Sequence, residues 1–310
     1  MIPLNIAAII PVYNRQYLII DAIKSVLNQT LLPKYLIIVD DGSTDATVSQ
    51  IEHWFKTNPA DIPIKLIKQK NGGASSARNH GVCEAGDCQL IAFLDSDDLW
   101  PDDYLQSAIK LFEDNPQLVA ASSNRIDKDY VKNVESIHNH TEITRNTTSY
   151  IFTRGSPGTP NTVLLKKAFE KVGGYDVLQM CGEDYQLFLR ISLLGQWGFI
   201  NSKPVEVRRN VQGHESQAPQ LSRQYNDRRL RLARILDQFI HEDGGYPHIP
   251  ESQWRQRIGQ LYFTAGRNAI KSKDWNSALE SLNKARKYRP FHIRTKILHL
   301  YLKTLKNNCF

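Results

Sequence analysis

The chain has 310 residues, 41% of them hydrophobic and 23% charged, a balance that excludes an intrinsically disordered protein. This length accommodates one large domain and a smaller one. The formal net charge is +7, which favours phosphates, anionic lipids or nucleic acid as partners. The basic residues gather toward the C-terminus, where a solvated helix face is the simpler interpretation and a lipid-facing patch the alternative.

Cysteine usage and hydropathy narrow the class of protein further. Cys83, Cys88, Cys181 and Cys309 form no Cys-x-x-Cys pair, so a zinc site is not expected. They are more typical of reduced thiols in the cytoplasm than of a disulfide framework. The first ten residues lack a basic start and predict a strand instead of a signal peptide. No apolar run reaches the roughly 18 residues of a membrane span.

The first hundred residues alternate short apolar runs with amphipathic stretches. Such alternation predicts a mostly parallel sheet flanked by helices, because buried parallel strands are apolar on both faces. The predicted strands are 6–10, 36–39, 64–67 and 90–94, and the predicted helices are 17–29, 44–57 and 74–85.

The remainder of the chain divides near residue 216. Residues 124–158 are polar and predict irregular strands and a mobile loop, followed by strands at 161–165 and 205–207 and a helix at 182–194. We therefore expect one α/β domain over 1–216 and an all-helical region over 217–310. Within that region, residues 261–288 resemble one tetratricopeptide-type hairpin. A single unit cannot bury both of its faces, so we expect it to cap the main domain or to form a homodimer.

Polar side chains follow three of the predicted strands. Tyr13 and Asn14 follow the first strand, Asp40 and Asp41 the second, and a run of acidic residues from Asp95 the fourth. In open α/β sheets, ligands bind outside the carboxyl ends of the strands. These three clusters are therefore expected to converge on one crevice.

The Asp95-Ser96-Asp97 triplet predicts a cation site. Two carboxylates at a strand end supply the oxygen ligands that Mg²⁺ or Mn²⁺ prefers, with open positions left for substrate phosphates. An acidic turn that caps the next helix would explain the triplet equally well if it stood alone.

Four segments together resemble family 2 glycosyltransferases, which have the GT-A fold. They occur in the family's order within about the first 215 residues, and they are Pro11-Val12-Tyr13-Asn14-Arg15, Asp40-Asp41-Gly42-Ser43-Thr44-Asp45, Gly72-Gly73-Ala74-Ser75-Ser76-Ala77-Arg78-Asn79 and Phe93-Leu94-Asp95-Ser96-Asp97-Asp98. The resemblance implies a metal-dependent, inverting transfer of a sugar, from a UDP-sugar in our interpretation, to an acceptor hydroxyl. A glycan or a lipid-linked acceptor, in polysaccharide or glycolipid synthesis, is the expected second substrate.

The resemblance also assigns roles in the donor site. It implies that base contacts come from Pro11, Tyr13 and Asp41, that ribose or metal is held by Asp95, that Asp97 is the principal metal ligand, and that Asn14, Gly73, Arg78 and Ser96 complete the donor site. We expect Gly72 and Gly73 to begin a helix with free N–H groups. Simpler alternatives remain: Tyr13 as a packed aromatic, Asp40 as a helix cap, and Arg78 as a surface or core-pairing arginine.

The acceptor half is implied by matches later in the chain. Glu183-Asp184 matches the family's acidic pair, with Asp184 as the general base and Glu183 tuning it. Two acids that stabilise a helix N-terminus are the alternative. His214 matches a histidine that completes the metal site. The segment 173–176 resembles the acceptor-side loop, and Trp197 is expected either to stack on a sugar or to be buried.

Two other functions fit the sequence less well than sugar transfer. A nucleotidyltransferase needs a glycine-rich basic loop after its first strand, where this chain has Pro11-Val12-Tyr13-Asn14. A non-catalytic helical-repeat protein would not need Asp95, Asp97 and Asp184. Nucleic-acid binding is not expected, because aromatic residues are not interleaved with the basic ones. We expect a cytoplasmic protein with peripheral contact to the inner membrane surface through its basic C-terminal helices.

Overall fold

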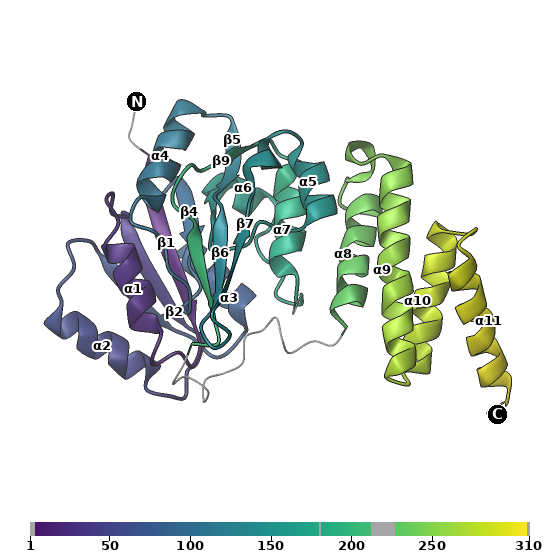
Figure 1. The fold of residues 1–310 in the computed structure, drawn as a ribbon. Coiled ribbons are helices and arrows are strands. Elements are labelled where there is room, and N and C mark those ends of the chain that lie inside the picture. The colour runs from purple at the N-terminus through teal and green to yellow at the C-terminus, as the bar shows by residue number, and fades with distance from the viewer. Residues whose placement is uncertain (1–3, 180, 212–226, 309–310) are drawn as a thin grey trace. The chain divides into compact units, whose positions relative to one another are not determined.

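The computed structural model describes residues 4–179, 181–211 and 227–308, which divide into two compact units, 1–219 and 220–310 (Figure 1). No helix among these residues is long and apolar enough to cross a membrane.

The first unit is built on a seven-stranded sheet in the order β3-β2-β1-β4-β8-β5-β9. Its neighbouring strands are parallel except at β8, which runs antiparallel to both β4 and β5. The predicted mostly parallel sheet is therefore confirmed. The strands are β1 (Ile6–Val12), β2 (Tyr35–Asp40), β3 (Ile64–Lys68), β4 (Leu90–Phe93), β5 (Leu118–Ser122), β8 (Thr162–Leu165) and β9 (Gln196–Phe199).

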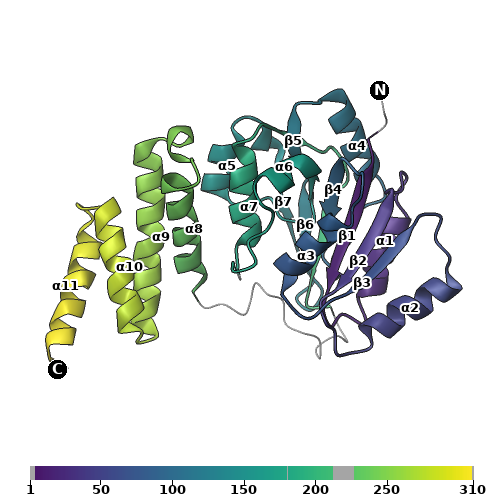
Figure 2. The ribbon, with the colours of Figure 1, turned by 180° about the vertical axis from the view of Figure 1, so that it is seen from behind.

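Helices cover the sheet where their apolar residues recur at helical spacing. On one face, α1 (Ile19–Leu27) and α4 (Tyr104–Asp114) bury their apolar sides against alternate residues of β1, such as Ile6 and Ile10. On the other face, α3 (Ala74–Cys83) packs against β1 and β2 (Figure 2). A Cβ at Gly81 of α3 would lie 2.4 Å from Ile9, so a glycine is needed for this close approach. The remaining helices of this unit are α2 (Thr47–Thr57), α5 (Thr147–Arg154), α6 (Lys166–Lys171), α7 (Glu183–Ser192) and the 3₁₀ turn η1 (Thr141–Thr144).

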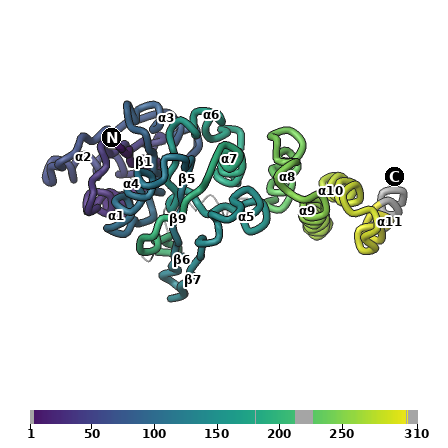
Figure 3. Tube along the Cα trace, turned by 90° about the horizontal axis from the view of Figure 1, so that it is seen from above, coloured from purple at the N-terminus to yellow at the C-terminus, as the bar shows by residue number. Residues whose placement is uncertain are grey.

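The polar stretch 124–158 is more regular than predicted. It contains a hairpin of β6 (Arg125–Asp129) and β7 (Val134–His138), seen projecting beside the main sheet in Figure 3, followed by η1 and α5. β6 also pairs in parallel with β10 (Val205–Arg209), which makes a second, three-stranded sheet. Polar strands can form here because Arg125 and Arg209 both pair with Asp127.

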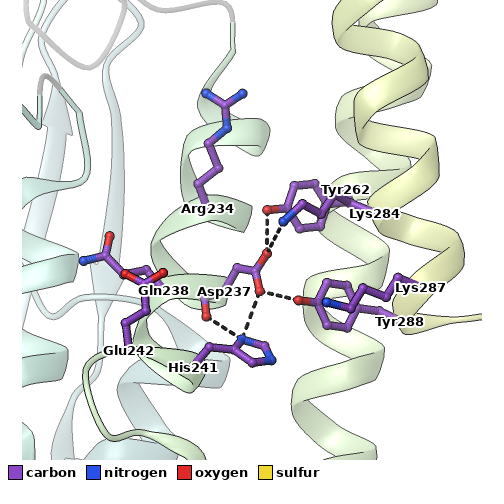
Figure 4. A pocket seen from close by; sticks show the side chains of 9 residues that line it. All are labelled: Arg234, Asp237, Gln238, His241, Glu242, Tyr262, Lys284, Lys287 and Tyr288. Carbon is purple, nitrogen blue, oxygen red and sulfur yellow. Dashed lines mark hydrogen bonds and ion pairs between the residues drawn. The ribbon is translucent and has the colours of Figure 1, made fainter.

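The second unit consists of helices α8 (Arg228–His241), α9 (Glu251–Lys271), α10 (Trp275–Tyr288) and α11 (Ile293–Asn308), with the 3₁₀ turn η3 (Tyr246–His248). Its helices surround a buried carboxylate, Asp237 of α8 (Figure 4). The hydroxyls of Tyr262 and Tyr288 and the ammonium of Lys284 all donate to it. A buried charge is tolerated here because two neighbouring helices, α9 and α10, supply these three hydrogen bonds.

Candidate active site

The loops that follow β1 and β2 are tied together by hydrogen bonds. The backbone N–H of Asn14 donates to the hydroxyl of Ser43 over 2.9 Å, and the Asn14 side-chain oxygen accepts from the N–H of Thr44 over 2.8 Å. Asn14 has a φ of 51°, a left-handed conformation that asparagine tolerates better than most residues. The ends of these two neighbouring strands are thus held as one unit.

Asp41 connects the loops after β1 and β2 to the start of helix α3. Its carboxylate accepts from the backbone N–H groups of Gly72 and Gly73, both over 2.8 Å, and from the side chain of Gln69. The expectation that both glycine N–H groups are free was therefore wrong, because the end of β2 places a carboxylate beside the start of α3 and the two satisfy each other. Gly73 has a φ of 88°, which a residue with a side chain would rarely adopt.

Arg78 links the donor-side strands to the second half of the unit. Its guanidinium is buried and donates to Asp95 over 2.7 Å and to Glu183 over 3.1 Å. The ring of Tyr175 lies against it, 5.2 Å from the guanidinium carbon. Both terminal nitrogens of Arg78 are thus paired with carboxylates in the interior, as in the alternative of a core-pairing arginine.

Asp97 and Asp98 lie beside two further arginines. Asp97 is 3.6 Å from Arg15, and Asp98 accepts from the backbone N–H of Arg208 over 3.0 Å. Burial raises the pKa of Asp97, an effect that Arg15 opposes and Asp95 reinforces. Burial also raises the pKa of Asp98 well above its usual value, with Asp97 and Asp95 adding to the rise. Crowded carboxylates of this kind gain from a cation that relieves their repulsion.

Glu183 and Asp184 begin helix α7. Burial raises the pKa of Glu183, and Asp184 beside it adds to that rise, while Arg78 opposes it. Asp184 accepts from the hydroxyl of Ser156 over 2.8 Å, and its other oxygen is taken by the N–H of Tyr185. The carboxylate of Asp184 is therefore held in one orientation from two sides.

The segment 173–176 is anchored to the same helix as Arg78. The side chain of Asn79 donates to the carbonyl of Tyr175 over 2.8 Å and accepts from its N–H over 2.9 Å. Trp197 is buried on β9 and donates to Ser122, so the buried alternative holds for this residue.

The structure brings most of the predicted site residues together. The contacts above join loops from β1, β2 and β4 with the starts of α3 and α7, across up to 105 residues of sequence. Pro11 is buried on β1, Ser96 is buried next to Asp95, and Tyr13 is 38% exposed. His214 lies outside the described residues.

Three contributors were not assigned roles from sequence. Arg15 was only part of a resembling segment, and neither Ser156 nor Arg208 was singled out. Arg208 donates through its Nε to the carbonyl of Asp97 and pairs with Asp21 of α1. Arg208 could have been recognised from its place at the end of the predicted strand that contains Val205 and Val207. An arginine in a buried strand is rare unless it is paired with an acid.

The donor set suits a hard cation held jointly with a substrate. Among the described residues, no three histidines, cysteines or acids form a cluster that could hold a metal ion alone. Asp95 and Asp97 supply carboxylate oxygens, and the side chain of Asp95 is 32% exposed. Mg²⁺ and Mn²⁺ commonly bind through one or two carboxylates plus substrate phosphates, so the residues present fit such an ion.

Two cavities lie away from these residues. One, of about 390 Å³, surrounds Asp237 in the helical unit (Figure 4). The other, of about 510 Å³, lies between Leu111, Arg145 and Trp197. Neither is lined by a predicted donor or catalytic residue.

Comparison with known proteins places the chain in a family. An uncharacterized glycosyltransferase of Rickettsia conorii is 41% identical over 134 residues, which is 43% of this chain and 21% of that protein. The chain therefore spans about a fifth of that relative's length. Among solved structures, S. aureus TarS 1–349 in complex with UDP-GlcNAc has a TM-score of 0.68 at 16% identity, with 95% of this chain and 84% of that one covered.

A second solved structure is similar over nearly the whole chain. The mannosyltransferase PcManGT of Pyrobaculum calidifontis, in complex with GDP-Man and Mn²⁺, has a TM-score of 0.56 at 19% identity, with 98% and 86% covered. At these sequence identities, the similarity to both structures supports the GT-A fold and nothing further. Residues 7–173, more than half of the chain, match the sequence profile of Glycosyl transferase family 2. The chain belongs to this family.

Proposed function

We propose that the chain transfers a sugar, with inversion, from a nucleotide-sugar to an acceptor hydroxyl of a growing glycan, polysaccharide or lipid-linked acceptor. The observation that carries this proposal is the contact of one arginine, Arg78, with acids from both halves of the unit, Asp95 and Glu183. A UDP-sugar is the proposed donor, in keeping with the UDP-GlcNAc bound by the similar TarS structure. We propose that the reaction takes place in the cytoplasm, at the inner membrane surface.

The donor is proposed to bind across the carboxyl ends of β1, β2 and β4. Tyr13 is exposed enough to stack on a base, and Asp41 offers the oxygen Oδ2, which accepts a single backbone bond from Gly73. Arg78 holds Asp95 and Glu183 in place as a positioning residue.

Asp95 and Asp97 are the residues proposed to hold a divalent cation, Mn²⁺ or Mg²⁺, and His214 is proposed to complete the site. The similar mannosyltransferase structure contains Mn²⁺. Such an ion supplies neutralisation of the negative charge that develops on a diphosphate leaving group.

Asp184 is proposed to take the proton of the acceptor hydroxyl. Inversion requires the hydroxyl to attack the anomeric carbon from the side opposite the leaving group, with a base beside the attacking oxygen. Ser156 and the N–H of Tyr185 fix the orientation of the Asp184 carboxylate. Glu183 is turned away into its contact with Arg78 and tunes the pair.

The test is Asp184→Asn, assayed for turnover with UDP- and GDP-sugars in the presence of Mn²⁺. We expect unchanged thermal unfolding, retained UDP binding by calorimetry, and a loss of turnover of roughly a hundredfold or more, as is typical of a removed general base. Asp114→Asn, a change at an exposed acid at the end of α4, is the matched control and should retain full activity. Full activity of Asp184→Asn would refute the assigned role.

A further inference from the structure

The positive charge of the chain is concentrated at one end. Residues 281–310 contain eight lysines and arginines and not one aspartate or glutamate, whereas residues 1–280 contain 31 basic and 32 acidic side chains. The whole excess of +7 therefore comes from α10, α11 and the short segment between them. A charge gathered in this way acts on partners as a local positive surface.

Helix α11 exposes three aliphatic side chains along one face. Ile293, Ile297 and Leu300 recur at spacings of four and three residues and therefore share one face. Their exposed fractions are 70%, 61% and 68%, and Phe291, just before the helix, is 87% exposed. An ordinary surface helix shows the opposite arrangement.

The buried side of α11 confirms this inversion. Thr295 and His299 are buried there, and the ring nitrogens of His299 lie 2.7 Å from the Asn283 side chain and 3.0 Å from Arg286 of α10. Leu302 is buried as well. α11 therefore packs through these hydrogen bonds and Leu302, and leaves Ile293, Ile297 and Leu300 exposed.

Basic side chains flank the exposed apolar face. Arg294 and Lys296 are both exposed on α11, and the ammonium of Lys296 lies 5.8 Å from the centre of the Phe291 ring. An apolar strip bordered by cations, without acids, suits a lipid surface: the aliphatic groups enter the headgroup boundary and the cations contact lipid phosphates. A second copy of the chain would bring two such basic ends together, and a nucleic acid offers no apolar surface to the aliphatic strip.

We propose that the α11 face, formed by Phe291, Ile293, Ile297 and Leu300, docks the protein on an anionic lipid membrane. This inference deepens the proposed function, because it brings the enzyme to the surface where a lipid-linked acceptor resides. It rests on the surface of the helical unit and does not depend on the chemistry assigned to Asp184.

The test is co-sedimentation of the full chain with phosphatidylcholine vesicles, with and without phosphatidylglycerol. We expect binding only when phosphatidylglycerol is present, and weaker binding as salt is raised. The double variant Ile293→Ser/Ile297→Ser should bind roughly tenfold or more weakly, because two aliphatic side chains are removed from the lipid contact. Donor hydrolysis in solution should match that of the unchanged protein, so loss of docking is distinguishable from loss of catalysis.

A matched control removes two exposed aliphatic side chains elsewhere. Val134 and Ile137 of β7 are 57% and 66% exposed, and Val134→Ser/Ile137→Ser should leave vesicle binding unchanged. Equal binding by both double variants, or equal binding to vesicles without phosphatidylglycerol, would overturn the proposal. So would a change of oligomeric state in the α11 variant without a change in vesicle binding, or retention of the chain by RNA and not by vesicles.

Discussion

Arg78→Lys tests whether one buried side chain joins the two halves of the active site. Arginine reaches Asp95 through one terminal nitrogen and Glu183 through the other, over 2.7 and 3.1 Å. Lysine keeps the charge but has a single nitrogen, which cannot take both positions. The variant should therefore lose one of the two charged hydrogen bonds while the site remains electrically balanced.

The magnitude follows from the burial of these groups. A hydrogen bond to a charged group contributes about 1.5–3 kcal/mol, and the Arg78 side chain is 6% exposed, so little water is present to replace it. We expect the free energy of unfolding to fall by about that amount. For a unit of this size, that corresponds to a decrease in Tm of roughly 3–12 °C.

Chemical unfolding and turnover should be measured on the same preparation. Turnover should fall more than donor binding, because Glu183 loses its partner beside the proposed base while the Asp41 contacts remain. Arg255→Lys is the control: Arg255 also pairs with an acid over 2.7 Å, but it is 44% exposed and should change stability by less than about 0.5 kcal/mol. If Arg78→Lys unfolds like Arg255→Lys, the bridge does not hold the halves together.

Two further predictions concern the proposed metal ligands and the helical unit. Because the pKa of Asp97 is raised, a proton competes with Mn²⁺ for this carboxylate, so the increase in Tm on adding Mn²⁺ should be larger at neutral pH than near pH 5. Asp97→Asn should abolish the increase. An increase that does not depend on pH would contradict this prediction. Without metal the sign is reversed: the folded state keeps the proton to higher pH than the unfolded chain, so Asp97 makes the fold less stable as the pH rises above the usual aspartate range. Tyr288→Phe should cost about 1–2 kcal/mol at neutral pH, since burial of Asp237 is outweighed by hydrogen bonds from Tyr288 and other donors, which lower its pKa. That difference should diminish as the pH falls below the usual aspartate pKa and be lost once the pH has fallen through the lowered pKa of Asp237. Exposed Tyr246→Phe should show no effect in the same urea titrations.

Local patterns in the sequence predicted the central strands and failed where the pattern was weaker. β1, β2 and β4 are apolar on both faces, so their apolar runs were recognisable. Residues 99–123 were given no element, although Leu105, Ile109 and Phe112 recur at helical spacing and form the buried side of α4. The β6–β7 hairpin was expected to be irregular, because its strands are polar and their stability comes from pairing with β10, a distant segment.

The site residues were recognisable by type, but their partners were not. Asp41 was assigned to a ligand, yet two of its bonds go to Gly72 and Gly73, a contact that depends on how β2 and α3 meet. Ser156 lies in a stretch without a motif, and it contacts Asp184 only because the fold closes 28 residues of chain between them. Spacing along a chain predicts which side chains share a helix face or a strand end, and it carries no information on contacts made between distant elements.

The balance of charge in the site explains why the proposed cation and the donor should bind together. Asp95, Asp97, Asp98 and Glu183 each have an arginine beside them or a raised pKa, and these four acids outnumber the three arginines Arg15, Arg78 and Arg208. A nucleoside diphosphate would bring further negative charge to a site that already has an excess of acids. A divalent cation between them reverses the sign of that interaction, because it attracts the carboxylates and the phosphates alike. The three arginines hold the acids close together. The one acid in excess leaves a net negative charge, which attracts a divalent cation.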